Sequence, residues 1–174
     1  SNLRTTADAL PSFISEKSIE LFTKHKIFTT VELHSRYEIL MELYCKKLRI
    51  EGLTMADMTK RQILPAIARY SAAVTKGALE KKQLSAEIPC DFEVGVVKAL
   101  SECATQLRAA SYKLEEKLAG AQGIEDTTEQ GEFYRDEVLP AMDAVRQAAD
   151  RAETLTDKKY WPFPDYTDLL YSVY

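Results

Sequence analysis

The feature that most constrains the fold is a line of apolar residues at alternating steps of four and three. It consists of Val96, Leu100, Cys103, Leu107, Ala110 and Leu114. A second line repeats this spacing with Val138, Met142, Val145, Ala149 and Ala152. On an α-helix such residues share one face, which is typical of the seam of a helical bundle or coiled coil. We therefore predict two long antiparallel helices, with a flexible break at 120–126 and a restart at Thr127 or Thr128.

Two further helices are predicted before these. The first covers Leu10 to His25, with Ser15 as a possible cap. The second is capped by Thr29 or Thr30 and runs to about Ile50, where Gly52 lets the chain turn. Its apolar stripe at steps of three and four consists of Leu33, Tyr37, Leu40, Tyr44 and Leu48.

A third long helix is predicted from Thr54 to about Leu84. Thr54 and Asp57 resemble a capping box, and the apolar pattern continues through Pro65. Because proline removes a backbone donor and its ring presses on the preceding turn, we expect a kink at this position. The same Leu-Pro-Ala triplet recurs at 139–141. A linker at 85–90 then leads to Asp91, which can cap the next helix.

No segment alternates in the manner of a strand flanked by hairpin turns. We expect an all-α fold, an antiparallel helical bundle with long kinked helices and an irregular C-terminal strap rich in aromatic residues and proline. The expected division is a connector with a short helix at 1–28, a bundle at 29–158 and the strap at 159–174, within one domain overall.

Length and charge narrow the class of protein. A chain of 174 residues is long enough for one core that buries roughly 70% of the unfolded surface. The net charge of -4, with basic and acidic residues interspersed, argues against a nucleic-acid partner. No apolar run of about 18 residues and no secretory leader is present, so we expect no membrane partner and a cytoplasmic location. Cys45, Cys90 and Cys103 are read as free thiols.

The strap gathers aromatic side chains around two prolines. These side chains belong to Tyr160, Trp161, Phe163 and Tyr166. Each carries a large apolar area that is unfavourable to leave in water. Two readings stay open: the strap folds back over its own helices, or it docks into a neighbouring domain or subunit.

No set of residues predicts catalysis. His25 and His34 lack a partner at metal-ligand spacing, and the chain has no glycine-rich phosphate loop. Glu32 and Arg36 are four apart and suit a surface ion pair. We therefore assign no catalytic, cofactor-binding or metal residue, and treat His34, Arg36 and Tyr37 as candidates for packing or interface contacts.

Several blocks together resemble one enzyme family. They are Ala9-Leu10-Pro11, the run 32–39 with His-Ser-Arg-Tyr-Glu, the runs 53–58 and 62–66, and Tyr160-Trp161-Pro162-Phe163-Pro164 followed by Asp168-Leu169-Leu170. In this order they resemble the carboxy-terminal helical domain of type III glutamine synthetases, over nearly the whole chain.

The resemblance implies a parent enzyme that joins glutamate and ammonia, using ATP with Mg or Mn and passing through a phosphorylated glutamate. The motifs for metal, ATP and phosphate in that family have no match here, so the chain alone is expected to hold no cofactor and to be inactive. Its implied partners are the catalytic domain of the same polypeptide and neighbouring subunits of a homo-oligomer. The implied role is structural; the alternative is a regulatory module that binds an effector or a partner protein.

Overall fold

The structure is a computed structural model that describes residues 3–164 and 166–171. Within these residues the regular structure is entirely helical and no strand occurs, which confirms the predicted all-α class. The α-helices are α1 (Thr6–Ala9), α2 (Glu16–Lys24), α3 (Thr30–Met58), α4 (Leu64–Leu84), α5 (Asp91–Ala121), α6 (Thr127–Phe133), α7 (Leu139–Leu155) and α8 (Tyr166–Tyr171). Three short segments wind differently: a 3-10 helix, η1 (Leu10–Ile14), and two π-helical turns, η2 (Thr59–Ile63) and η3 (Tyr134–Val138).

The helices fall into two compact units. Unit 1 contains residues 1–54 and 114–142, and unit 2 contains residues 55–113 and 143–174. Each unit is thus assembled from two stretches that lie far apart in the sequence. The long helices α3 and α5 each contribute to both units.

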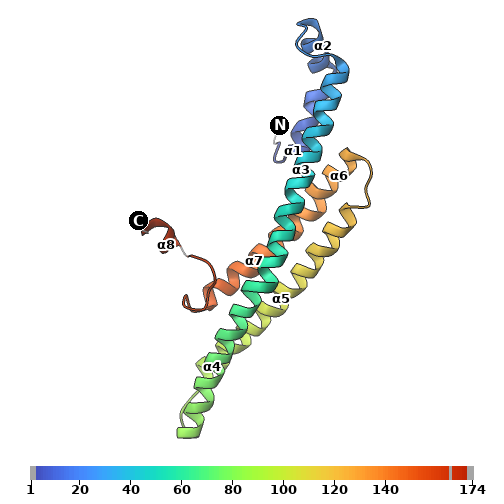
Figure 1. Cartoon of the computed structure of the whole chain (residues 1–174). Coiled ribbons are helices and arrows are strands. Elements are labelled where there is room, and N and C mark those ends of the chain that lie inside the picture. Colours follow the sequence, from blue (N-terminus) through green and yellow to red (C-terminus); the bar gives the residue numbers. More distant parts are fainter. Residues whose placement is uncertain (1–2, 165, 172–174) are drawn as a thin grey trace. The chain divides into compact units, whose positions relative to one another are not determined.

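Unit 1 is a bundle of α3, the end of α5 and α6 with η3. Lys117 of α5 pairs with Glu137 of η3 at 2.6 Å, and Gly120 lies against Phe133, so α5 and α6 are antiparallel around their loop. Figure 1 shows this loop joining the two ribbons. The buried apolar side chains of the unit include Leu33, Tyr37, Met41, Cys45, Leu48, Leu114, Leu118, Tyr134 and Val138.

The predicted turn at Gly52 is wrong, because α3 continues to Met58. Gly52 instead allows a close contact between helices: a Cβ at this position would lie 3.0 Å from the Leu118 side chain. Thr54 caps nothing, and its hydroxyl donates instead to the Ile50 carbonyl at 2.8 Å. Leu40, placed on the inner stripe by its spacing, is 43% exposed, whereas Met41 is fully buried.

The single helix predicted from Leu10 to His25 is divided in the structure. A capping box between Thr5 and Asp8 starts α1, and η1 then leads to Ser15. Ser15 accepts from the Ser18 amide and caps α2, as predicted. α1 and η1 pack on α3, where Ala7 joins Tyr37 and Met41 in one apolar cluster with Leu10, Phe13, Ile14 and Tyr44.

Unit 2 contains the hairpin of α4 and the first part of α5, which Figure 1 shows side by side. Lys81 and Glu93 form an ion pair across the linker, and the Cys90 thiol donates to the Ala78 carbonyl at 3.6 Å. Asp91 is the first residue of α5 rather than its cap, since Val94 donates to the Cys90 carbonyl. The predicted seams are buried at Leu100, Cys103, Leu107 and Leu114 on α5 and at Val138, Val145 and Ala152 on the second line.

Both Leu-Pro-Ala triplets follow a π-helical turn. η2 ends directly before Leu64-Pro65 and η3 directly before Leu139-Pro140. A proline inside a helix clashes with the carbonyl four residues earlier, and here that carbonyl belongs to a π turn, where the ring of hydrogen bonds is wider. The distortion expected from the sequence at Pro65 therefore takes the form of a π turn, and Pro140 repeats it.

The strap predicted at 159–174 is not irregular over all of its described residues. Residues 161–164 are not helical, as Pro162 and Pro164 predict, but α8 begins at Tyr166. Residues 165 and 172–174 of the predicted strap lie outside the described residues. The strap is therefore partly irregular and partly helical.

Candidate functional site

The three candidates on α3 have separate roles. His34 and Arg36 are exposed, and the Arg36 guanidinium lies 4.5 Å from the centre of the Phe28 ring. Tyr37 is buried and its hydroxyl is 3.0 Å from the Thr128 hydroxyl of α6. Tyr37 therefore fastens α3 to α6, while His34 and Arg36 remain on the surface.

The Glu32 side chain takes part in capping the start of α3 and does not form the predicted ion pair with Arg36. Its carboxylate accepts from the Thr29 amide at 2.8 Å and from the Thr29 hydroxyl at 2.9 Å. These bonds, with a smaller contribution from the Arg36 charge, lower the pKa of Glu32. Thr29 is thus the cap of α3, one of the two caps that the sequence offered.

A second polar cluster ties the amino terminus to η3. Arg135 donates to Asp8 at 3.1 Å and makes two bonds to Asp136, at 2.7 and 2.8 Å. The Thr5 hydroxyl, with help from Arg135, lowers the pKa of Asp8. The carboxylate at the start of α1 thus has two partners in the folded chain, one local and one 127 positions away.

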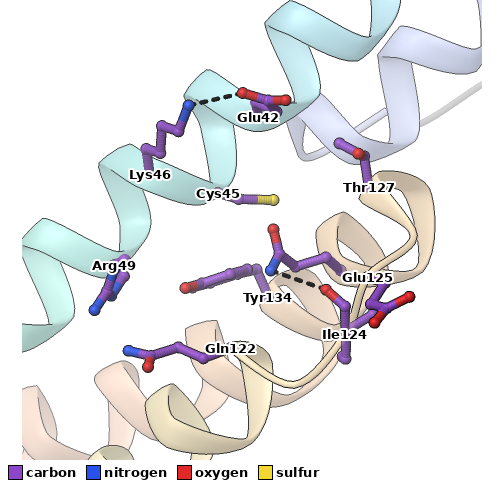
Figure 2. Close-up of a pocket in the computed structure, with 10 residues that line it drawn as sticks. Glu42, Cys45, Lys46, Arg49, Gln122, Ile124, Glu125, Thr127 and Tyr134 are labelled. Atoms are coloured by element: carbon purple, nitrogen blue, oxygen red, sulfur yellow. Dashed lines mark hydrogen bonds and ion pairs between the residues drawn. The ribbon is translucent and has the colours of Figure 1, made fainter.

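Unit 1 also contains a cavity of about 470 Å³, lined by α3 on one side and by the loop and α6 on the other. Figure 2 shows Cys45 and Arg49 of α3 facing Tyr134 and Gln122 across it. With the Gln122 amide oxygen turned toward the guanidinium, Arg49 donates to it at 2.7 and 3.1 Å. Lys46 and Glu42 pair on its rim at 2.7 Å. The cavity therefore presents both signs of charge.

Two of the groups that line this cavity, the Cys45 thiol and the Tyr134 phenol, are neutral at physiological pH. Burial raises the pKa of the Cys45 thiol to about 11, and the nearby Glu42 carboxylate adds to the effect. Burial likewise raises the pKa of the Tyr134 phenol, with Cys45 as the next cause. A thiol that stays protonated is a poor nucleophile, so this pair does not supply covalent or acid-base chemistry near pH 7.

The aromatic candidates of the C-terminal segment contact each other and α4. The Tyr160 ring lies 5.3 Å from the Tyr70 ring, and Trp161 meets Phe163 edge-on at 6.3 Å. Trp161 and Phe163 remain half-buried. The side chain of Tyr166 lies outside the described ones. Of the two readings left open by the sequence, the fold-back reading thus has the Tyr70 contact in its favour.

The described residues contain neither a metal-ligand cluster nor a membrane-spanning helix. No group of three or more His, Cys, Asp or Glu side chains is placed to hold a metal ion. No helix in the same part of the chain combines the length and the apolar character needed to cross a membrane.

Sequence reasoning did not identify the cavity or the Arg135 cluster. Both bring residues of α1 or α3 together with residues that follow α5. The spacing of residues within one segment cannot predict contacts between segments so far apart in the sequence. The one available signal was Tyr134, which stands four residues before Val138 and so continues the second apolar line.

The known proteins that this chain resembles are all named as glutamine synthetases. A sequence model described as "Glutamine synthetase C-terminal domain" matches residues 1–82. The chain is 38% identical over 172 residues to "Glutamine synthetase" of Butyrivibrio fibrisolvens. The aligned region covers 99% of this chain and 25% of that protein.

Two other relatives extend the likeness. "Type-3 glutamine synthetase" of Dictyostelium discoideum is 29% identical over 98% of this chain and 24% of its own length. "Glutamine synthetase" of Bacteroides fragilis is 24% identical with the same coverage of each. The chain thus spans about a quarter of the length of the curated relatives it matches, and the resemblance read from the sequence is confirmed.

Proposed function

We propose that this chain is the helical C-terminal part of a glutamine synthetase, and the match of residues 1–82 to the glutamine synthetase C-terminal domain model supports this proposal. The parent protein would be an ATP-dependent glutamate-ammonia ligase that forms glutamine, ADP and phosphate. The observation that carries this proposal is the coverage: 99% of the chain aligns with 25% of a relative named glutamine synthetase.

The role proposed for the chain within that enzyme is structural. It braces the catalytic domain and supports a homo-oligomer in the cytoplasm, with neither nucleic acid nor membrane as a partner. We assign ATP and the Mg or Mn ions to the remainder of the parent. Within the chain, 1–28 would be the connector, 29–158 the bundle and 159–174 the strap rich in aromatic residues and proline.

Several features support a bracing role. Apolar side chains stand exposed on the last helix, where Leu169, Leu170 and Tyr171 are 64%, 72% and 76% exposed. Surface of this kind is costly in water and is typical of a contact with another domain or subunit. Trp161 and Phe163 lie next to it in the sequence and are only half-buried.

The test compares the parent enzyme with a version that lacks residues 29–174. We expect the shortened protein to lose its oligomeric state in light scattering, and glutamine formation to fall with it. The chain on its own should form no glutamine from glutamate, ammonia and ATP. Turnover by the isolated chain, or full assembly of the shortened parent, contradicts the structural role.

The strap can be tested with Trp161→Ala, which removes the edge-on partner of Phe163. If the strap docks on a neighbour, the oligomer dissociates while the melting temperature of the isolated chain stays the same. If it packs only on unit 2, the isolated chain itself melts earlier. No change in either measurement contradicts both forms of the proposal.

A regulatory module is the second candidate, and the cavity in unit 1 favours it. About 470 Å³ lined by Arg49, Lys46, Glu42 and Glu125 suits a small molecule that carries both charges. In that case deletion of residues 29–174 leaves assembly intact and abolishes the response of the enzyme to the effector. Loss of assembly instead favours the structural role.

A further inference from the structure

Helix α3 carries a second line of apolar residues whose side chains are all exposed. Ile39, Leu43, Ile50 and Leu53 are 54%, 55%, 66% and 46% exposed. With Lys46 they follow one another at steps of four, three, four and three. All five positions belong to unit 1. We refer to these five positions as the outer seam.

The outer seam lies on the opposite side of α3 from the core. At about 100° per residue, its members fall within an arc of about 80°, and the buried Tyr37, Met41 and Leu48 fall around the reverse direction. A surface helix that is needed only for its own bundle is apolar on one side. α3 is apolar on two, so its second side calls for a separate explanation.

The spacing indicates what kind of element fits. Alternating steps of four and three keep side chains in line with a partner helix that crosses at a shallow angle, as in a coiled coil. From Ile39 to Leu53 the seam rises about 21 Å, which is two heptads. A loop or strand gains nothing from this periodicity, whereas an amphipathic helix can place its own apolar line along it.

Lys46 decides against a second copy of α3 as that helix. It is the middle member of the seam, so a symmetric pair of α3 helices that matches all five positions, parallel or antiparallel, brings the two Lys46 ammonium groups together. Like charges at a helix seam are destabilising. A different helix can instead place a carboxylate opposite Lys46, beside the Glu42 that already pairs with it at 2.7 Å.

We propose that the outer seam binds an amphipathic helix from the part of the same parent polypeptide that precedes residue 1. This inference rests on the proposed function, by which the chain is the C-terminal domain of a protein about four times its length. The amino-terminal residues belong to unit 1, as the seam does. A helix tethered there has a high effective concentration at the seam, which favours it over a partner free in solution.

The test places a photo-crosslinking benzoyl-phenylalanine at Leu43 in the full-length parent, prepared as a mixture of ¹⁴N- and ¹⁵N-labelled subunits. We expect mass spectrometry to find crosslinks to a helical segment before residue 1, with both peptides carrying the same isotope. The same group at Tyr160 is a positive control, because the Tyr70 ring lies 5.3 Å away. Crosslinks to α3 of another copy, crosslinks of mixed isotope, or none at Leu43 while Tyr160 reacts, each overturn the proposal.

A second measurement uses Ile50→Asp, with Val31→Asp as its control on the same helix. Val31 is 78% exposed and lies outside the seam. In the parent, Ile50→Asp should speed amide exchange in the preceding helix that Leu43 captures by about tenfold or more, whereas Val31→Asp leaves it unchanged. Equal effects of the two substitutions overturn the proposal. The proposed function is tested separately by assaying the parent for glutamine formation. A parent that forms no glutamine contradicts the proposed function, whatever crosslinks it gives.

Discussion

The two π turns, η2 and η3, both accommodate a proline within a helix, but their side chains make different contacts. Each precedes a Leu-Pro-Ala triplet, but η3 buries Tyr134 and anchors Arg135 and Glu137 to other elements. In η2 the Lys60 ammonium lies 5.4 Å from the centre of the Tyr112 ring of α5, and Arg61 pairs with Asp57 one turn earlier. The buried Thr59 hydroxyl of the same turn has no hydrogen-bond partner among the described residues. The turn itself thus follows from the proline, whereas its stability depends on the contacts that surround it.

The largest expected effect comes from Tyr134→Ala in the anchored turn. Removing a ring that is only 2% exposed should lower the free energy of unfolding by about 3–5 kcal/mol. Urea unfolding followed by circular dichroism measures it. Tyr134→Phe keeps the ring and should cost about 1 kcal/mol or less. Equal losses from both variants would show that the hydroxyl, and not the packing, supports η3.

Gly131, three residues before η3, should give the next effect. A Cβ here would lie 2.4 Å from the Met41 sulfur, so Gly131→Ala forces Met41 to move and should cost about 1–3 kcal/mol. Gly95→Ala is the matched control, since nothing lies within 4 Å of its Cβ. It should stabilise the chain by up to about 1 kcal/mol. A neutral Gly131→Ala would mean that Met41 repacks freely.

Arg135→Gln should have a smaller effect that depends on pH. The lowered pKa of Asp8 means that its bonds to Thr5 and Arg135 stabilise the folded chain above the ordinary carboxyl pKa of 3.8. That contribution disappears as the pH falls through the lowered value. The variant should therefore unfold earlier than the unsubstituted chain at pH 7 and similarly at the acid end. A difference between the two that is constant with pH excludes Asp8 as the partner that matters.

Thr59→Val, in η2, should give the smallest effect and the opposite sign. It replaces a buried hydroxyl that has no partner in the described structure with a methyl group of similar shape. The free energy of unfolding should rise by about 1 kcal/mol or less. Differential scanning calorimetry can resolve such a change. A clear loss of stability would reveal a hydrogen bond to Thr59 in solution.

The periodic parts of this fold could be predicted from the sequence because their signal is local. The seam through Leu100, Cys103 and Leu107 is buried as its spacing predicted. The boundary at Gly52 was wrong because the same residue serves turns and close helix contacts, and only Leu118, 66 positions later, distinguishes them. For the same reason the cavity and the Asp8 cluster could not be foreseen, since each depends on a pairing of distant segments.

The three buried cysteines give each unit its own built-in reporter. Cys45 lies in unit 1 and is 3% exposed, while Cys90 and Cys103 lie in unit 2 and are 7% and 1% exposed. A thiol reagent can modify such groups only when the surrounding helices open. The rate of alkylation, resolved by mass spectrometry peptide by peptide, therefore times the opening of the two units separately in the unmodified chain.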